Sequence, residues 1–130
     1  MSNDNTTPEL ENEATEQAAL QAFSVADLDD DRPMVEKVTL TLPDGRLREL
    51  HVRRLTGEEA IDVLTAAAAQ KNRIDVSVMK MKRCLVAAED HTQPLFSDKL
   101  ALDIAKKKSA EWLAAFLAAI HEVNPLIKNA

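Results

Sequence analysis

The feature that most constrains the fold is an alternation of apolar and polar residues over 35–42, which reads VEKVTLTL. Val38, Leu40 and Leu42 fall on one side of an extended chain and threonines fall on the other, which predicts a half-buried strand. The following PDG at 43–45 favours a tight turn, because proline presets φ and glycine allows positive φ. The next segment, RLRELHVRR, alternates again and therefore predicts a β-hairpin.

A hairpin alone is marginally stable in water, so its apolar face is expected to pack on helices. Thr56-Gly57-Glu58-Glu59 has the pattern of a capping box, in which Thr56 and Glu59 bond each other's main-chain N–H and start a helix. Helical spacing predicts about four helices. The residues expected to face inward are Ile61, Leu64 and Ala68 in the first helix and Val78, Met81, Leu85 and Ala88 in the second, which is expected to start near Asp75. In the third helix, which follows Ser97, they are Leu100, Ala101 and Ile104. In the fourth helix, between Ser109 and Asn124-Pro125, they are Leu113, Phe116, Leu117 and Ile120.

Charge divides the chain into two parts. Residues 1–33 hold nine acidic residues and one basic residue, a net charge of −8, whereas residues 34–130 carry +2. The first part is also poor in bulky apolar residues, which is typical of disorder, although a short helical stretch around 15–23 remains open. We therefore predict an α+β, mostly helical fold: a disordered acidic tail over 1–33, then a β-hairpin and helical bundle over 34–130.

Several classes of function lack support in the residues. The single cysteine, Cys84, cannot form an internal disulfide or a zinc site of the CxxC type, and we expect a buried structural thiol in a reducing, cytosolic setting. His51, His91 and His121 do not have the spacing of metal ligands. No nucleotide-binding or hydrolase motif is present, so no catalytic residue, metal or cofactor is expected. The amino terminus does not read as a signal peptide, and no apolar run is long enough to span a membrane.

Basic residues form small groups at 53–54, at 80–83 and at 106–108. Phosphate contacts are one interpretation, and a small DNA-binding regulator is the alternative function that these groups keep open. The nearly neutral charge of 34–130 argues against a nucleic-acid partner. We expect Lys80, Lys82 and Arg83 to lie on the solvated face of their helix. Arg53 and Arg54 are expected to pair with Glu58, Glu59 or the acidic tail.

The strongest amphipathic pattern in the chain lies in its last helix. A domain of this size buries only a modest core, so part of this apolar face is expected to remain available to a partner helix. The candidate partner-binding residues are Trp112, Leu113, Phe116, Leu117, Ile120, Leu126 and Ile127.

The order of the motifs resembles the phage tail assembly chaperones, in particular the Mu-like and P2-like small tail assembly proteins. In that group a strand, a DG turn, a second strand and an Arg-Arg-Leu-Thr-like segment lead into the first helix. The matching residues are Asp44-Gly45, Arg53-Arg54-Leu55-Thr56 and Leu95-Phe96-Ser97, within VTLTLPDGRLRELHVRRLTGEEAIDVL and the later PLFSD. The resemblance covers roughly 35–127 and leaves out the acidic tail.

The resemblance implies a non-enzymatic assembly factor in the host cytoplasm. Such a protein coats the tape measure protein, whose long apolar helical stripes would otherwise aggregate, until tail tube subunits polymerise around it. It is absent from the finished virion, and a longer frameshifted form often recruits the tube protein. The implied partners are thus the tape measure and tail tube proteins, with no nucleic acid and no membrane, and a homo-oligomer remains open.

Overall fold

The structure is a computed structural model that describes residues 20–29, 32–69 and 72–130. The chain divides into two units, Met1–Arg32 and Pro33–Ala130. In the first unit the described residues form one 3₁₀ turn, η1 (Val25–Leu28), where the Ser24 N–H donates to the Asp27 carboxylate at 2.9 Å. The expected helical stretch over 15–23 is not seen in its described part, 20–23. The rest of it, and most of the expected tail over 1–33, lie outside the described residues.

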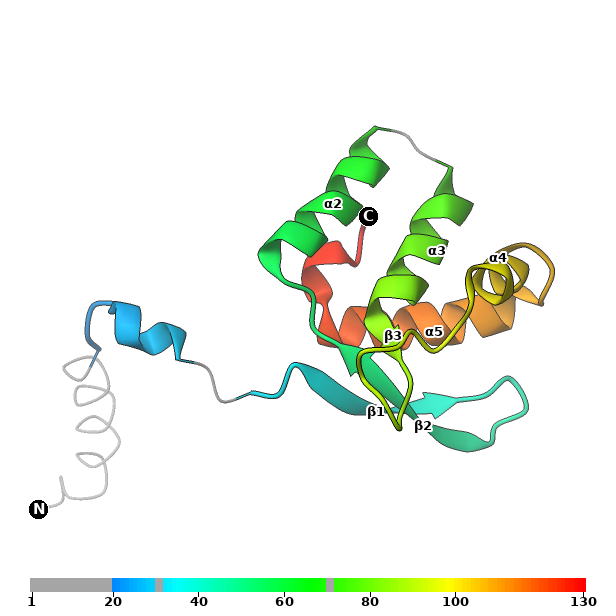
Figure 1. Ribbon diagram of the computed structural model, residues 1–130, viewed down its shortest axis with the longest axis horizontal. Helices are drawn as coiled ribbons and strands as arrows, with labels where there is room; N and C mark the ends of the chain where they lie inside the picture. The colour runs from blue at the N-terminus through cyan, green and yellow to red at the C-terminus, as the bar shows by residue number, and fades with distance from the viewer. Residues whose placement is uncertain (1–19, 30–31, 70–71) are drawn as a thin grey trace, which may run out of the picture. The chain divides into compact units, whose positions relative to one another are not determined.

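The second unit has the predicted α+β, mostly helical fold, with a three-stranded antiparallel sheet and four α-helices among the described residues (Figure 1). The elements in chain order are β1 (Val35–Thr41), β2 (Leu47–Arg53), α2 (Gly57–Ala68), α3 (Arg73–Cys84), β3 (Leu85–Val86), α4 (Asp98–Lys106), α5 (Ala110–Val123) and the 3₁₀ turn η2 (Pro125–Ile127).

The hairpin forms as the alternation predicts. Val38 pairs with Leu50 in an antiparallel register, and both side chains are buried. Gly45 takes φ +92° in the turn, a left-handed conformation that favours glycine. Val52 is fully buried, so the hairpin contributes one apolar face to the core.

A third strand, β3, was not predicted. We expected the second helix to continue through Leu85 to Ala88, but it ends at Cys84, and Leu85–Val86 pairs with Val52 and His51 of β2. Extended backbone places successive side chains on opposite faces, and both faces are covered here, with Leu85 0% and Val86 5% exposed. The pairing also gives partners to main-chain groups of β2 that a continued helix would leave unbonded.

The helices cover one face of the sheet. α5 packs on both β1 and β2, and α3 packs on α5, α4 and α2, so α3 is the central helix of the domain (Figure 1). The largest fully buried side chains come from these central elements and from the end of the chain: Met81, Leu85, Ile120, Ile127, Val52, Val63 and Cys84.

At most helix starts, the observed N-cap is the residue that the sequence predicts. Thr56 and Glu59 form the predicted capping box, and the Ser97 Oγ accepts the Leu100 N–H at 3.1 Å. The second helix starts earlier than expected, because Asn72 rather than Asp75 is its N-cap and accepts the Ile74 N–H at 2.8 Å.

Two predicted helix faces are wrong. Ile61 is 59% exposed, and Ala60 and Val63 take the buried face of α2 instead. This helix has apolar residues around much of its circumference, so its spacing fits several faces and packing against α3 selects one. In α3, Lys80 was placed on the solvated face but is buried, as described below.

Candidate functional site

An apolar groove lies between α4 and α5. It has a volume of about 260 Å³, and its lining includes one charged side chain. The capped start of α4 and the α4–α5 connection bring these side chains together from two helices and the preceding loop. The lining residues are Phe96, Leu100, Ile104, Lys108, Trp112 and Phe116.

Aromatic rings form the floor of this groove. Phe116 is buried, and its ring meets Phe96 edge-on with centroids 5.1 Å apart and Trp112 in a stacked arrangement at 6.1 Å. Such arrangements are favourable beyond the area that they bury. Trp112 is half-buried, so its ring is fixed on one side and accessible on the other. The groove is therefore a preformed apolar surface.

Exposed leucines extend the apolar surface beside the groove. Leu100, which lines it, is 41% exposed, and Leu95, directly before the groove-lining Phe96, is 38% exposed. Single exposed leucines are ordinary in proteins, but here they adjoin a concave aromatic site. This combination is typical of a surface that accepts apolar side chains of another molecule.

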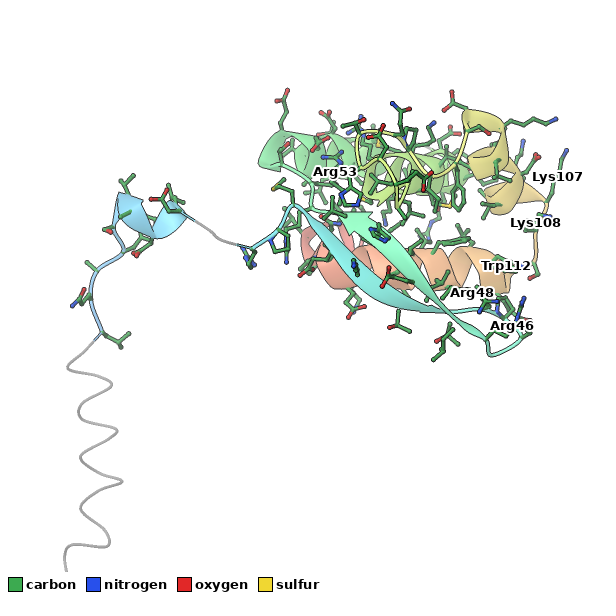
Figure 2. The ribbon with its side chains drawn as sticks, turned by 60° about the horizontal axis from the view of Figure 1, so that its bottom comes forward. Arg46, Arg48, Arg53, Lys107, Lys108 and Trp112 are labelled. Carbon is green, nitrogen blue, oxygen red and sulfur yellow. The ribbon has the colours of Figure 1, made fainter. Side chains whose placement is uncertain are left out.

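Basic residues gather at the same end of the domain as Trp112 (Figure 2). Arg46 and Arg48 come from the β1–β2 end, and Lys107 and Lys108 follow α4. Arg46 pairs with Asp44 at 2.6 Å and Lys107 with Asp103 at 3.7 Å. Arg48 and Lys108 make no ion pair with any residue that the structure describes. Of these four basic residues, Lys108 lines the groove.

The structure separates the seven predicted partner-binding residues. Trp112 and Phe116 line the groove. Leu113 and Leu117 are half-buried. Ile120 and Ile127 are completely buried, so they belong to the core, and the prediction that they contact a partner is corrected on this ground. Leu126 is 66% exposed but follows the opposite end of α5 from Trp112.

Part of the groove was missed in the sequence. Leu100 and Ile104 were expected only as inward core residues of α4, and Phe96 was named only within the Leu95-Phe96-Ser97 motif. Ile104 is indeed buried, but its side chain also lines the groove. The available signal was an aromatic residue, Phe96, directly before the Ser97 N-cap of α4.

The basic groups considered for phosphate contacts are largely engaged elsewhere. Arg53 donates two parallel hydrogen bonds to Glu59, at 2.9 and 2.7 Å, and Arg54 pairs with Glu36 at 2.8 Å. These bonds confirm the expected pairing of Arg53 with Glu59, whereas Glu36 is not among the partners expected for Arg54. The Arg53 guanidinium, with the Thr56 N–H, lowers the pKa of Glu59 to about 2.

The second basic group, at 80–83, is also engaged. Lys82 pairs with Asp98 at 2.8 Å and Arg83 with Asp62 at 3.3 Å. Lys80 is only 3% exposed, so it does not lie on the solvated face with Lys82 and Arg83. The group therefore does not present three cations on one solvated face.

Two histidines far apart in the sequence meet in the structure. His51 Nδ1 lies 3.1 Å from His91 Nε2, and His51 Nε2 lies 3.2 Å from Glu49. Within residues 20–29, 32–69 and 72–130, no group of three or more His, Cys, Asp or Glu residues is arranged to hold a metal ion. The contact helps fix the 87–94 loop against β2, and Val86 of β3 forms a bridge to Pro94 at the end of this loop.

Cys84 is completely buried, as expected for a structural thiol. Burial raises its pKa to about 12, so the thiol is protonated and a poor nucleophile at neutral pH.

Comparison with protein-family models, with curated proteins and with solved structures yields no match to this chain. None of the helices that the structure describes is both long and apolar enough to cross a membrane.

Proposed function

We propose that this protein is a phage tail assembly chaperone that binds the tape measure protein through the α4–α5 groove. It would act in the host cytoplasm, help to recruit tail tube subunits and be absent from the finished virion. The observation that carries the proposal is a preformed aromatic groove with exposed leucines beside it. The tape measure protein is proposed as the client because the order of motifs from Asp44-Gly45 to Thr56 resembles that family.

The size of the groove fits helix-in-groove recognition. A volume of about 260 Å³ accepts one or two aliphatic side chains, such as those at i and i+4 of an amphipathic helix. The contact of one copy would be weak, and it would be released readily when tube subunits arrive. Many copies along one rod-like client would gain avidity, provided that the copies also interact with each other or with the tube protein.

The basic side chain at the groove, Lys108, suggests which part of the client would bind. Lys108 lines the groove and lacks an ion-pair partner among the described residues, so an acidic residue beside the apolar stripe of a client helix would be attracted to it. Such charges affect association rate and orientation more than affinity.

Binding to single-stranded nucleic acid or DNA is the second candidate. The observation that favours it is the presence of Trp112 at the same end as Arg46, Arg48, Lys107 and Lys108, because stacking rings among cations bind nucleic-acid strands (Figure 2). The net charge of +2 over 34–130 and the engagement of Lys82 and Arg83 argue against it.

The test is co-expression with the tape measure protein, followed by size-exclusion chromatography. The informative variant is Leu100→Glu, which puts a charge into the groove at the third position of α4. There the new carboxylate can complete a capping box with Ser97, so the helix should persist. The control is Leu126→Glu, at an exposed position outside the groove.

We expect the wild type and Leu126→Glu to hold the client in solution and Leu100→Glu to lose it. A client that stays insoluble with the wild type, or a folded Leu100→Glu that binds as well as the wild type, would contradict the proposal. An electrophoretic shift of a DNA or RNA strand at low salt, abolished by Arg48→Gln and Lys108→Gln together, would favour the second candidate instead.

A further inference from the structure

A buried histidine of β2 meets a histidine of the loop between β3 and α4. His51 is 8% exposed, and its Nδ1 lies 3.1 Å from His91 Nε2. The other ring nitrogen of His51, Nε2, lies 3.2 Å from a carboxylate oxygen of Glu49. A carboxylate accepts hydrogen bonds, so a neutral His51 carries its proton on Nε2 and presents the lone pair of Nδ1 to His91.

The separation of these two ring nitrogens suits two ligands of one metal ion. Bonds from zinc to histidine nitrogen are about 2.0–2.1 Å long, so two tetrahedral ligands lie about 3.4 Å apart and two ligands at a right angle about 2.9 Å apart. The observed 3.1 Å falls between these values. The two rings are tilted by 47°, and His91 is exposed, so its ring is free to rotate until both lone pairs point at one ion.

The side chains around the pair favour a cation. Histidines that bind metals usually donate their other N–H to a carboxylate, which fixes the tautomer and the orientation of the ring. Glu49 is placed to do this for His51, and Asp90 adds a second negative charge next to His91 in the sequence. Lys37, which is paired with His51 across the hairpin, is exposed, so its long side chain can extend into solvent.

The loop that carries His91 is ordered by its own hydrogen bonds. The Gln93 N–H donates to the main-chain oxygen of Asp90 at 3.0 Å. The Asp90 carboxylate accepts the N–H and the hydroxyl of Thr92 at 3.0 and 2.6 Å. His91 is therefore held near His51 before any ion binds, which reduces the entropic cost of binding.

We propose that His51 Nδ1 and His91 Nε2 bind a Zn²⁺ ion, with Glu49 as a positioning residue. The ion would replace the hydrogen bond between the rings, with His91 in its Nδ1–H tautomer. Water would fill the other coordination positions, because no third His, Cys, Asp or Glu of the described residues completes a group of ligands. The two histidines lie 40 residues apart, so their spacing in the sequence does not indicate the site. The site is independent of the tape measure proposal, because neither histidine lines the α4–α5 groove.

The test is a titration of the full chain, labelled with ¹⁵N, with zinc chloride in a buffer that does not bind metals. We expect saturable binding that shifts the amide resonances of His51 and of the 87–94 loop, and a melting temperature that rises with the zinc concentration. Magnesium chloride is the control for charge alone, because Mg²⁺ prefers oxygen ligands, and it should leave these resonances in place. Equal shifts with both ions, or zinc shifts that spare His51 and the loop, would overturn the site.

Variants assign the ligands. His91→Gln removes one ligand at an exposed position, so the fold should persist while zinc binding weakens by at least about tenfold. Glu49→Gln keeps both ligands but removes the carboxylate, and it should also weaken zinc binding by about tenfold or more. His121→Gln, which removes the histidine outside the pair, is the matched control and should bind zinc like the wild type. Unchanged zinc binding by His91→Gln would overturn the site, and unchanged binding by Glu49→Gln would overturn the positioning role.

Discussion

Asn124 holds the junction between the sheet and the helices by bonding Leu55, 69 residues earlier in the chain. Its Oδ1 accepts the Leu55 N–H at 2.8 Å, and its Nδ2 donates to the main-chain oxygens of Arg53 and Ile120 at 3.0 and 3.3 Å. One buried amide therefore ties the segment between β2 and α2 to the end of α5. It connects the hairpin to the helical layer through its hydrogen bonds, in addition to the apolar contacts.

Asn124→Ala should destabilise the fold by about 1–3 kcal/mol, because it leaves the Leu55 N–H and the Arg53 carbonyl without their side-chain partner. Urea denaturation followed by circular dichroism measures the change. Asn129→Ala, at an exposed position, is the control and should unfold like the wild type. Equal midpoints for Asn124→Ala and the wild type would show that water replaces the amide without cost.

Glu59→Gln should weaken the fold in a pH-dependent manner. The pKa of Glu59 is lowered from 4.5 to about 2 in the folded protein, so its ionised form stabilises the fold above about pH 4.5, and this stabilisation is lost as the pH falls toward 2. Because the side chain is 29% exposed, solvent screening reduces the effect, and we expect about 1–2 kcal/mol at neutral pH.

The measurement is the difference in unfolding free energy between wild type and Glu59→Gln as a function of pH. The difference should be constant near neutral pH and should shrink below about pH 4.5. Glu58→Gln is the control, because Glu58 is exposed and adjacent in sequence. A difference that is independent of pH would show that the neutral glutamine merely repacks poorly beside Arg53.

The Cys84 thiol should resist modification in the folded protein. It is fully buried and its pKa is raised to about 12, so neither access nor ionisation favours attack. Labelling with a disulfide reagent at about pH 8 should proceed only as fast as the domain opens, and it should become rapid in denaturant. Rapid labelling without denaturant would mean that the end of α3 opens locally.

Leu126 and Ile127 are adjacent in the sequence, but we expect the same substitution to have very different effects on stability at the two positions. Ile127→Asp places a charge at a completely buried site and should abolish cooperative unfolding or cost about 4 kcal/mol or more. Leu126→Asp changes a side chain that is 66% exposed and should alter stability by no more than about 0.5 kcal/mol. Thermal unfolding by circular dichroism compares the two, and similar losses in both variants would contradict the observed burial.

Local chemistry made much of the fold predictable. The alternation around Val38 and Leu50 predicts the hairpin, the turn requires Gly45, and Thr56 with Glu59 starts α2, because each signal acts between residues close in the sequence. Ser97 likewise marks the start of α4. These features depend on backbone preferences and short-range hydrogen bonds, which a sequence shows directly.

The candidate site was less predictable. Trp112 and Phe116 were identified from the spacing of α5, but their groove also needs Phe96 and Leu100, which come from other segments. Whether an apolar residue faces a groove or the core depends on how two helices pack. The same reason explains why Ile120 and Ile127, which share the apolar character of Trp112, are core residues.

The sequence by itself determined the α+β class, the hairpin with its turn, the starts of α2, α4 and α5, and the contrast between an acidic first part and a nearly neutral domain. Only the tertiary structure decided that Leu85–Val86 is a strand, that Lys80 is buried beside His121, that Asn124 bonds Leu55, and that a groove opens between α4 and α5. The physical reason is the range of the interactions: capping, turn formation and periodicity act within a few residues, whereas burial and the pairing of distant polar groups depend on which surfaces meet when the chain packs.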